Sequence, residues 1–217
     1  FEISAEVLSV EPALAGAAVK QAVAGYNRAG IVSTTKHFPG HGGATADSHT
    51  TLPVLTDSLA ALQARDLAPF ATAVQAGAPS VMIGHLDVEA IAPGVPSSLA
   101  PQVYDYLRGE LGFEGVAITD SLGMGAVAGT PALAVKALQA GADLLLMPAD
   151  TRRAHATITA ALEDGTLDRA RVEEAAARVV ALQRWQARIA RDRPVDESAV
   201  EKAEAASAVL REAAYGY

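Results

Sequence analysis

Residues 115–120 read GVAITD, a short apolar run that ends at an aspartate. Three other short runs, IVSTT, SVMIG and DLLLM, begin at residues 31, 80 and 143. None of them alternates polar and apolar side chains, as a strand with one solvated face would. Such runs are typical of strands in a parallel sheet that is covered on both faces. The sequence therefore predicts four parallel strands, at 31–35, 80–84, 115–119 and 143–147.

Longer helical patterns separate these runs, at residues 12–28, 57–76, 98–111 and 131–140. Pro12 suits the first turn of a helix, and a glycine follows the end of each pattern, as is common at helix C-termini. The alternation of strands and helices predicts an α/β fold with right-handed crossovers. Further helices are predicted at 151–163, 168–191 and 197–214, the second with a core-facing stripe of Leu182, Trp185 and Ile189.

Polar side chains follow each predicted strand. They are Lys36 and His37 after the first run, His85 after the second, Asp120 after the third and Asp150 after the fourth. Ligands of parallel α/β folds lie beyond the carboxyl ends of the strands. We therefore expect these side chains to share one rim, which would be the active site.

Composition excludes several classes of protein. Half of the 217 residues are hydrophobic and 19% are charged, which fits a folded domain. The formal net charge of −8 predicts no nucleic-acid partner. The absence of cysteine excludes disulfides, thiolate metal sites and cysteine nucleophiles. No apolar run approaches the roughly 20 residues that span a bilayer, so no membrane span is expected.

Residues 36–49, KHFPGHGGATADSH, concentrate ionisable groups on a glycine-rich segment. A metal site is one interpretation, because imidazole and carboxylate ligands suit zinc. However, Pro39 and Gly40 break the helix that would place His37 and His41 on one face. A solvated surface loop is a second interpretation, and a catalytic loop is a third.

The catalytic interpretation depends on three residues. Asp47 and His49 are two positions apart, so in an extended segment their side chains lie on the same side. The carboxylate can then orient the imidazole, which transfers protons near neutral pH. Asp120 on the same rim would be a carboxylate nucleophile, although a lone aspartate there can also cap a helix.

Several motifs resemble glycoside hydrolase family 3 β-N-acetylhexosaminidases, a group that includes the peptidoglycan-recycling β-N-acetylglucosaminidases. The most specific is KHFPGHG at 36–42, followed by DSH at 47–49 and LP at 52–53. The others, in the order of the family, are PF at 69–70, VMIGH at 81–85, LGFEGV at 111–116, ITDSLGM at 118–124 and GADLLLMP at 141–148.

This resemblance implies a retaining hydrolysis in two steps, without metal or cofactor. Asp120 matches the nucleophile, His49 the acid/base residue and Asp47 its partner. The substrate-binding residues implied are Lys36, His37, His41, His85 and Met124. Of these, His41 could also shape the loop, His85 could act from behind the contact residues, and Met124 could be part of the core.

The resemblance also implies a TIM-type (β/α)8 barrel, of which the four predicted strands match strands 5–8. We therefore expect residues 1–150 to form the C-terminal half of the barrel, and residues 151–217 to form helices that pack on it. Residues 1–12 lack the arginine that the family often has there. The expected partner is the N-terminal half of the barrel, as another chain or segment, and the chain alone is expected to be poorly active. The C-terminal run 204–214 resembles the helix that leads many members into a second domain.

The expected substrates are terminal β-linked N-acetylglucosamine residues of muropeptides or chitooligosaccharides, in a bacterial protein that is cytoplasmic, secreted or lipid-anchored. Within the family, a β-N-acetylglucosaminide phosphorylase and a β-glucosidase are the alternatives. A zinc hydrolase that uses His37, His41, Asp47 and His49, and a non-catalytic sugar-binding fragment, are alternatives from other classes.

Overall fold

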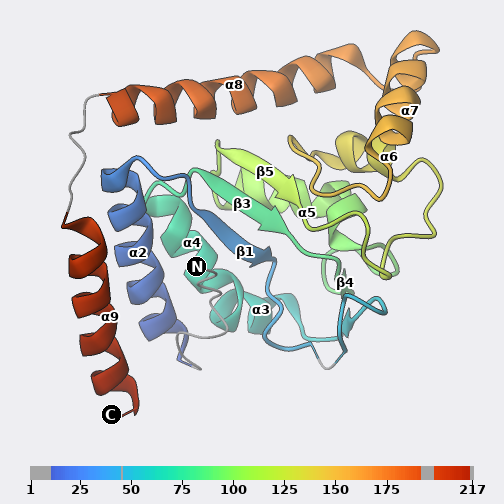
Figure 1. Cartoon of the computed structure of the whole chain (residues 1–217). Helices are drawn as coiled ribbons and strands as arrows, with labels where there is room; N and C mark the ends of the chain where they lie inside the picture. Colours follow the sequence, from blue (N-terminus) through green and yellow to red (C-terminus); the bar gives the residue numbers. More distant parts are fainter. Residues whose placement is uncertain (1–10, 45, 192–197, 216–217) are drawn as a thin grey trace.

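Three parallel strands form the centre of the fold (Figure 1). The computed structural model describes residues 11–44, 46–191 and 198–215. The strands β1 (Thr34–Phe38), β3 (Ser80–Ile83) and β5 (Val116–Thr119) pair in the order β1-β3-β5. The α/β class and three of the four predicted strands are thereby confirmed. β1 begins three residues later than predicted, because Gly30 and Ile31 close the preceding helix with hydrogen bonds to Asn27 and Tyr26.

The fourth predicted strand, at 143–147, is not a regular strand. It lies beside β5 and is joined to it by an isolated bridge between Ile118 and Leu144. The N–H of Leu146 donates to the hydroxyl of Thr119, over 3.1 Å, and not to a backbone carbonyl. Met147 then has a positive φ of 43°. These two departures from ladder geometry explain why the prediction of a full strand was wrong.

A second parallel sheet joins β2 (Val54–Leu55) to β4 (Asp87–Val88). It was not predicted, because strands of two residues have no readable periodicity. This small sheet connects the segment after residues 36–49 to the segment after β3.

Most of the predicted helices form, with some divisions. The helices are α2 (Pro12–Ala29), α3 (Leu59–Arg65), α4 (Leu67–Gln75), η1 (Ser97–Leu99), α5 (Pro101–Asp105), the π-helix η2 (Tyr106–Glu110), α6 (Leu133–Ala140), α7 (Thr151–Glu163), α8 (Arg169–Arg191) and α9 (Ala199–Tyr215). The helix predicted at 57–76 divides at Asp66, because Pro69 has no N–H to continue the first helix. The helix predicted at 98–111 divides at Pro101, which starts α5.

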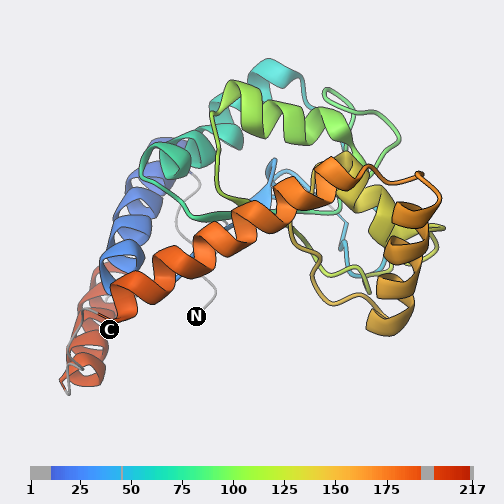
Figure 2. The same cartoon turned by 90° about the horizontal axis from the view of Figure 1, so that it is seen from above.

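The sheet is fully covered on only one face. Val81, Ile83 and Ala117 point toward the helices and are buried, whereas Met82 and Ile118 on the other face are half-buried. Figure 2 shows α2, α4, α5, α6 and α7 along an arc around the strands, with α8 passing in front of the strands in this view. The prediction that both faces would be buried is therefore wrong at Met82 and Ile118, whereas Ser80 and Val116, at the amino end of the same face, are buried.

Helix α8 spans the amino ends of the strands. Near its end Ile189 packs on Gly30, where an added Cβ would lie 2.6 Å from the Ile189 Cγ2. Near its start Arg171 donates to Asp143 over 2.6 Å. Because α8 bridges between these points, its predicted core stripe of Leu182, Trp185 and Ile189 is only half-buried.

Asp143 is the centre of a buried ion cluster at the start of the segment beside β5. Its side chain is fully buried and accepts hydrogen bonds from Arg108 over 2.6 Å, from Arg171 over 2.6 Å and from Arg178 over 3.2 Å. It also accepts the backbone N–H of Ala117 in β5 over 3.0 Å. One carboxylate thus holds α8, η2 and β5 together at the end of the fold remote from the predicted rim.

Candidate active site

Asp120 is the first residue after β5 and is held by two backbone hydrogen bonds. Its own N–H donates to the carbonyl of Ile83 over 2.9 Å, which ties it to β3. Its Oδ1 accepts the N–H of Ser121 over 2.7 Å. The residue is 9% exposed. The orientation of its carboxylate is therefore fixed, because Oδ1 is hydrogen-bonded to Ser121 and Oδ2 points away from that bond.

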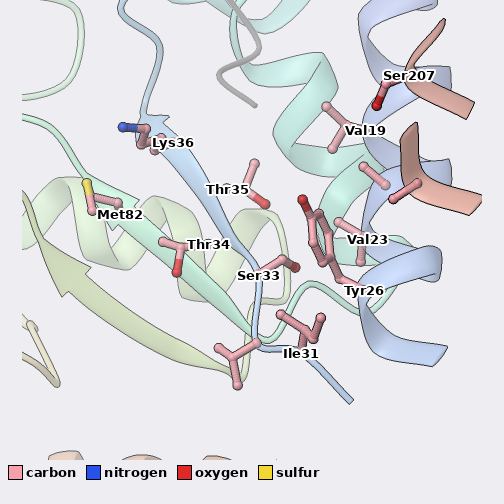
Figure 3. Close-up of a pocket in the computed structure, with 13 residues that line it drawn as sticks. Val19, Val23, Tyr26, Ile31, Ser33, Thr34, Thr35, Lys36, Met82 and Ser207 are labelled. Atoms are coloured by element: carbon pink, nitrogen blue, oxygen red, sulfur yellow. The ribbon is translucent and has the colours of Figure 1, made fainter. Parts of the chain in front are cut away.

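The other oxygen of Asp120 faces His37. The Oδ2 atom lies 3.7 Å from Nε2 of His37, which stands near the end of β1. Lys36 precedes His37 and shares its side of β1 with Thr34, across from Met82 (Figure 3). The rim expected from the sequence therefore brings the ends of β1, β3 and β5 together around Asp120.

Asp47 and His49 form the local pair expected from their spacing. The Nδ1 of His49 lies 2.7 Å from Oδ1 of Asp47, and the backbone N–H of His49 donates to the same oxygen over 2.9 Å. These two bonds, the backbone one first, lower the pKa of Asp47. An ionised carboxylate only accepts hydrogen bonds, so Nδ1 carries the proton and Nε2 is the ring nitrogen left to face outward. The His49 side chain is 77% exposed.

A backbone hydrogen bond joins the loop of His49 to the loop that follows Asp120. The N–H of Gly125 donates to the carbonyl of His49 over 3.1 Å. A Cβ at position 125 would lie 2.7 Å from the carbonyl oxygen of Thr50, so the loops meet at a distance that only glycine allows. Sequence reasoning missed Gly125, for which the only signal was its repeat with Gly123.

The glycines of residues 36–49 rest on the junction of α3 and α4. Gly40 has a φ of 137°, and a Cβ there would lie 2.3 Å from the Cβ of Asp66. A Cβ on Gly43 would lie 2.7 Å from a guanidinium nitrogen of Arg65. Arg65 also pairs with Asp57 over 3.2 Å and with Asp66 over 2.8 Å. This ion cluster, missed from the sequence, supports the loop from below, and burial raises the pKa of Asp66.

The remaining predicted residues differ in their surroundings. His41 lies 3.3 Å through Nε2 from the hydroxyl of Ser48, and its ring meets that of His37 edge-on at 5.8 Å between centroids. His85 is fully buried below the rim, and Met124 is 8% exposed. The site therefore has an open layer around His37 and His41, and a closed layer that contains His85.

Among the described residues, no three histidine or acidic side chains are grouped so that they could hold a metal ion. In the same part of the chain, no helix combines the length and the apolar character needed to span a bilayer.

One family model matches most of the chain. Residues 2–182 match the model described as the glycosyl hydrolase family 3 N-terminal domain. The chain belongs to glycosyl hydrolase family 3. The N-terminal domain of this family is a TIM-barrel-like α/β fold, and the parallel α/β arrangement described above agrees with it.

Relatives and solved structures of family 3 agree with this assignment. A protein named beta-hexosaminidase from Stenotrophomonas maltophilia (strain K279a) is 38% identical over 149 residues, which cover 67% of this chain and 44% of the relative. The chain thus spans less than half the length of that relative. A β-N-acetylglucosaminidase structure from Paenibacillus has a TM-score of 0.79 at 34% identity, covering 86% of this chain and 37% of that one. The Thermotoga maritima β-N-acetylglucosaminidase has a TM-score of 0.72 at 27% identity, covering 82% and 39%.

Proposed function

We propose that this chain belongs to a retaining glycoside hydrolase that removes terminal β-linked N-acetylglucosamine from muropeptides or chitooligosaccharides. One observation carries the proposal: the fixed Asp120 carboxylate and the Asp47–His49 pair lie on two loops joined by the Gly125–His49 hydrogen bond. The names of the relatives, beta-hexosaminidase and β-N-acetylglucosaminidase, support the sugar.

The first step forms a covalent intermediate. The Oδ2 atom of Asp120 attacks the anomeric carbon while the bond from that carbon to the leaving oxygen breaks. Nε2 of protonated His49 gives its proton to the leaving oxygen, which departs as an alcohol. Asp47 accepts the Nδ1–H of His49 and stabilises the imidazolium before the transfer.

The second step reverses these roles. Neutral His49 accepts a proton from water through Nε2, and the water oxygen attacks the anomeric carbon. The ester bond to Asp120 breaks, and the carboxylate leaves with the bonding electrons. Lys36 and His37, at the end of β1, are assigned to sugar hydroxyls, with His41 beside them shaping the loop.

We also propose that residues 1–150 supply the region of strands 5–8 of an eight-stranded barrel, with the irregular segment at 143–147, beside β5, in the place of strand 8. Residues 151–217 would supply helices that pack on it. Three observations support this. β1 is an edge strand of the described sheet, the face carrying Met82 is only half-buried, and the chain spans 44% of a relative. Beside β1 lies a cavity of about 670 Å³ between α2, β1 and α9, lined in part by the half-buried Tyr26 and the exposed Ile31 (Figure 3). The N-terminal half of the barrel would close this edge.

Hydrolysis of a chromogenic β-N-acetylglucosaminide tests the function. We expect turnover that does not depend on phosphate when the chain is joined to its N-terminal half, and weak turnover by residues 1–217 alone. Phosphate-dependent turnover would instead indicate a phosphorylase, and preference for a β-glucoside a β-glucosidase. Loss of activity to a chelator would indicate a zinc hydrolase, and sugar binding without turnover by the joined protein would indicate a binding module.

A further inference from the structure

His85 stands two residues after β3 and is fully buried, yet both of its ring nitrogens have partners. Nδ1 lies 2.7 Å from the hydroxyl of Ser98. Nε2 lies 2.9 Å from the backbone carbonyl of Ser121, the residue that follows Asp120. A side chain in this position has no open path to a sugar.

The hydrogen-bond partners determine the tautomer of His85. The Ser121 carbonyl can only accept, so Nε2 must carry a proton. Burial lowers the pKa of His85, against the opposing effects of the Ser121 hydrogen bond and the Asp120 charge, so the ring is neutral. Nδ1 is then an acceptor, and the hydroxyl of Ser98 donates to it. Ser98 is itself buried, and its carbonyl accepts the hydroxyl of Tyr104 over 2.9 Å.

Ser121 is consequently held at both of its backbone polar groups. Its carbonyl accepts from His85, and its N–H donates to Oδ1 of Asp120. The same carbonyl also accepts the N–H of Met124 over 3.1 Å, and the three bonds together fix the turn at which β5 ends. With Oδ1 occupied in this way, Oδ2 is the oxygen directed to the rim, where it faces His37.

We propose that His85 is a positioning residue that acts through Ser121 to keep Asp120 Oδ1 occupied and present Oδ2 to the anomeric carbon. The inference rests on the proposed function, because it assumes that Asp120 is the nucleophile. It replaces direct sugar contact as the role of His85. A buried chain from Tyr104 through Ser98 and His85 to Ser121 thereby supports the reacting oxygen.

The test uses the full-length protein and a fluorinated N-acetylglucosamine analogue that traps the glycosyl-enzyme. His85→Leu removes both hydrogen bonds, whereas His85→Gln keeps an N–H donor toward Ser121. We expect His85→Leu to slow labelling of Asp120 by about 10²-fold, the loss typical of a 1 Å misplacement. We expect His85→Gln to recover most of that loss, and the affinity for N-acetylglucosamine as an inhibitor to change little in both variants.

Three further measurements distinguish a loss of positioning from misfolding. Nitrogen-15 spectra of the unaltered protein should show His85 as the neutral tautomer protonated at Nε2. Ser98→Ala keeps the ring and removes only its hydroxyl partner, and should slow labelling by a few-fold. Ser80→Ala, a buried serine at the opposite end of β3, should label at the normal rate.

The outcomes separate the two hypotheses. If the unaltered protein is labelled at Asp120 and His85→Leu is labelled equally fast, the positioning role is wrong and the proposed function stands. A large loss of inhibitor affinity without slower labelling would restore His85 as a sugar contact and also refute the positioning role. If the unaltered protein is never labelled at Asp120, the proposed function is wrong, and the positioning role that rests on it is wrong too.

Discussion

The backbone N–H of Gly125 donates a hydrogen bond to the carbonyl oxygen of His49 over 3.1 Å. This contact joins the loop that carries the proposed acid/base to the loop that follows the proposed nucleophile, Asp120. A Cβ at position 125 would lie 2.9 Å from that carbonyl oxygen and 2.7 Å from the one of Thr50. The distance between the two functional groups therefore depends on a residue without a side chain.

Replacing Gly125 by alanine should displace the His49 loop. We expect kcat/KM to fall by about 10²-fold, because displacement of a catalytic group by about 1 Å costs about that much. The fall should be greater for substrates with poor leaving groups, which need the proton of His49. Gly129→Ala is the matched control, because no atom lies within 4 Å of a Cβ there. Equal activity of the two variants would contradict the role of this contact.

Replacing His49 by alanine should reduce the rate according to the leaving group. General acid catalysis contributes about 10²- to 10⁴-fold, so hydrolysis of poor leaving groups should fall by that range. Activated aryl substrates should be affected less in the first step, because their leaving oxygens need little protonation. A series of aryl β-N-acetylglucosaminides measures how steeply the rate depends on the pKa of the leaving group. A uniform loss across the series would argue against His49 as the acid.

Replacing Asp143 by alanine should strongly destabilise the fold. The substitution leaves Arg108, Arg171 and Arg178 close together without their shared carboxylate. Removing one partner of a buried ion pair costs about 3–5 kcal/mol. Urea unfolding measures the difference, with Asp105→Ala, an exposed acid on α5, as a control expected within about 0.5 kcal/mol of the parent. A loss below about 1 kcal/mol would show that the cluster does not hold α8 in place.

The burial of His85 should lower the free energy of unfolding in mild acid. Its folded pKa is lowered by burial from the ordinary 6.5, so below about pH 6.5 the unfolded chain binds a proton that the folded chain does not. The free energy of unfolding should therefore fall by up to about 1.4 kcal/mol per pH unit below that point. Asp120, the charged group that faces His85, opposes the shift, and Tyr104 on the far side of Ser98 stays neutral there.

His85→Gln should lack this component of the pH dependence. Unfolding free energies at pH 7.5, 6.5 and 5.5 test the difference, because the other four histidines are common to both proteins and their effects cancel. Parallel curves for the two proteins would mean that His85 titrates normally in the folded state.

The sequence predicted the central strands well because their signal is local. The apolar runs at 80–84 and 115–119 correspond to β3 and β5 within one residue at each end. The run at 143–147 is also mostly apolar, but there the N–H of Leu146 donates to the hydroxyl of Thr119 instead of a backbone carbonyl. This hydrogen bond joins two residues that are 27 positions apart, and a local pattern of apolar residues does not detect such a contact.

The candidate site was likewise predictable only where its contacts are local in the sequence. Asp47 and His49 are two positions apart, so their pairing follows from local geometry, and the structure forms it. The support from Gly125 and Arg65 depends on loops that meet only in the folded chain. The burial of His85 depends on Ser98 and Ser121, 13 and 36 positions away, so the sequence left open whether this histidine contacts the sugar or acts from behind the contact residues.

Covalent trapping tests the central claim most directly. The full-length protein would be treated with a fluorinated N-acetylglucosamine analogue, digested and mapped by mass spectrometry. The account predicts one sugar adduct, on the peptide that contains Asp120, and its disappearance in Asp120→Asn. A sugar adduct on another residue, or an adduct that persists in Asp120→Asn, would contradict the claim that this carboxylate is the nucleophile.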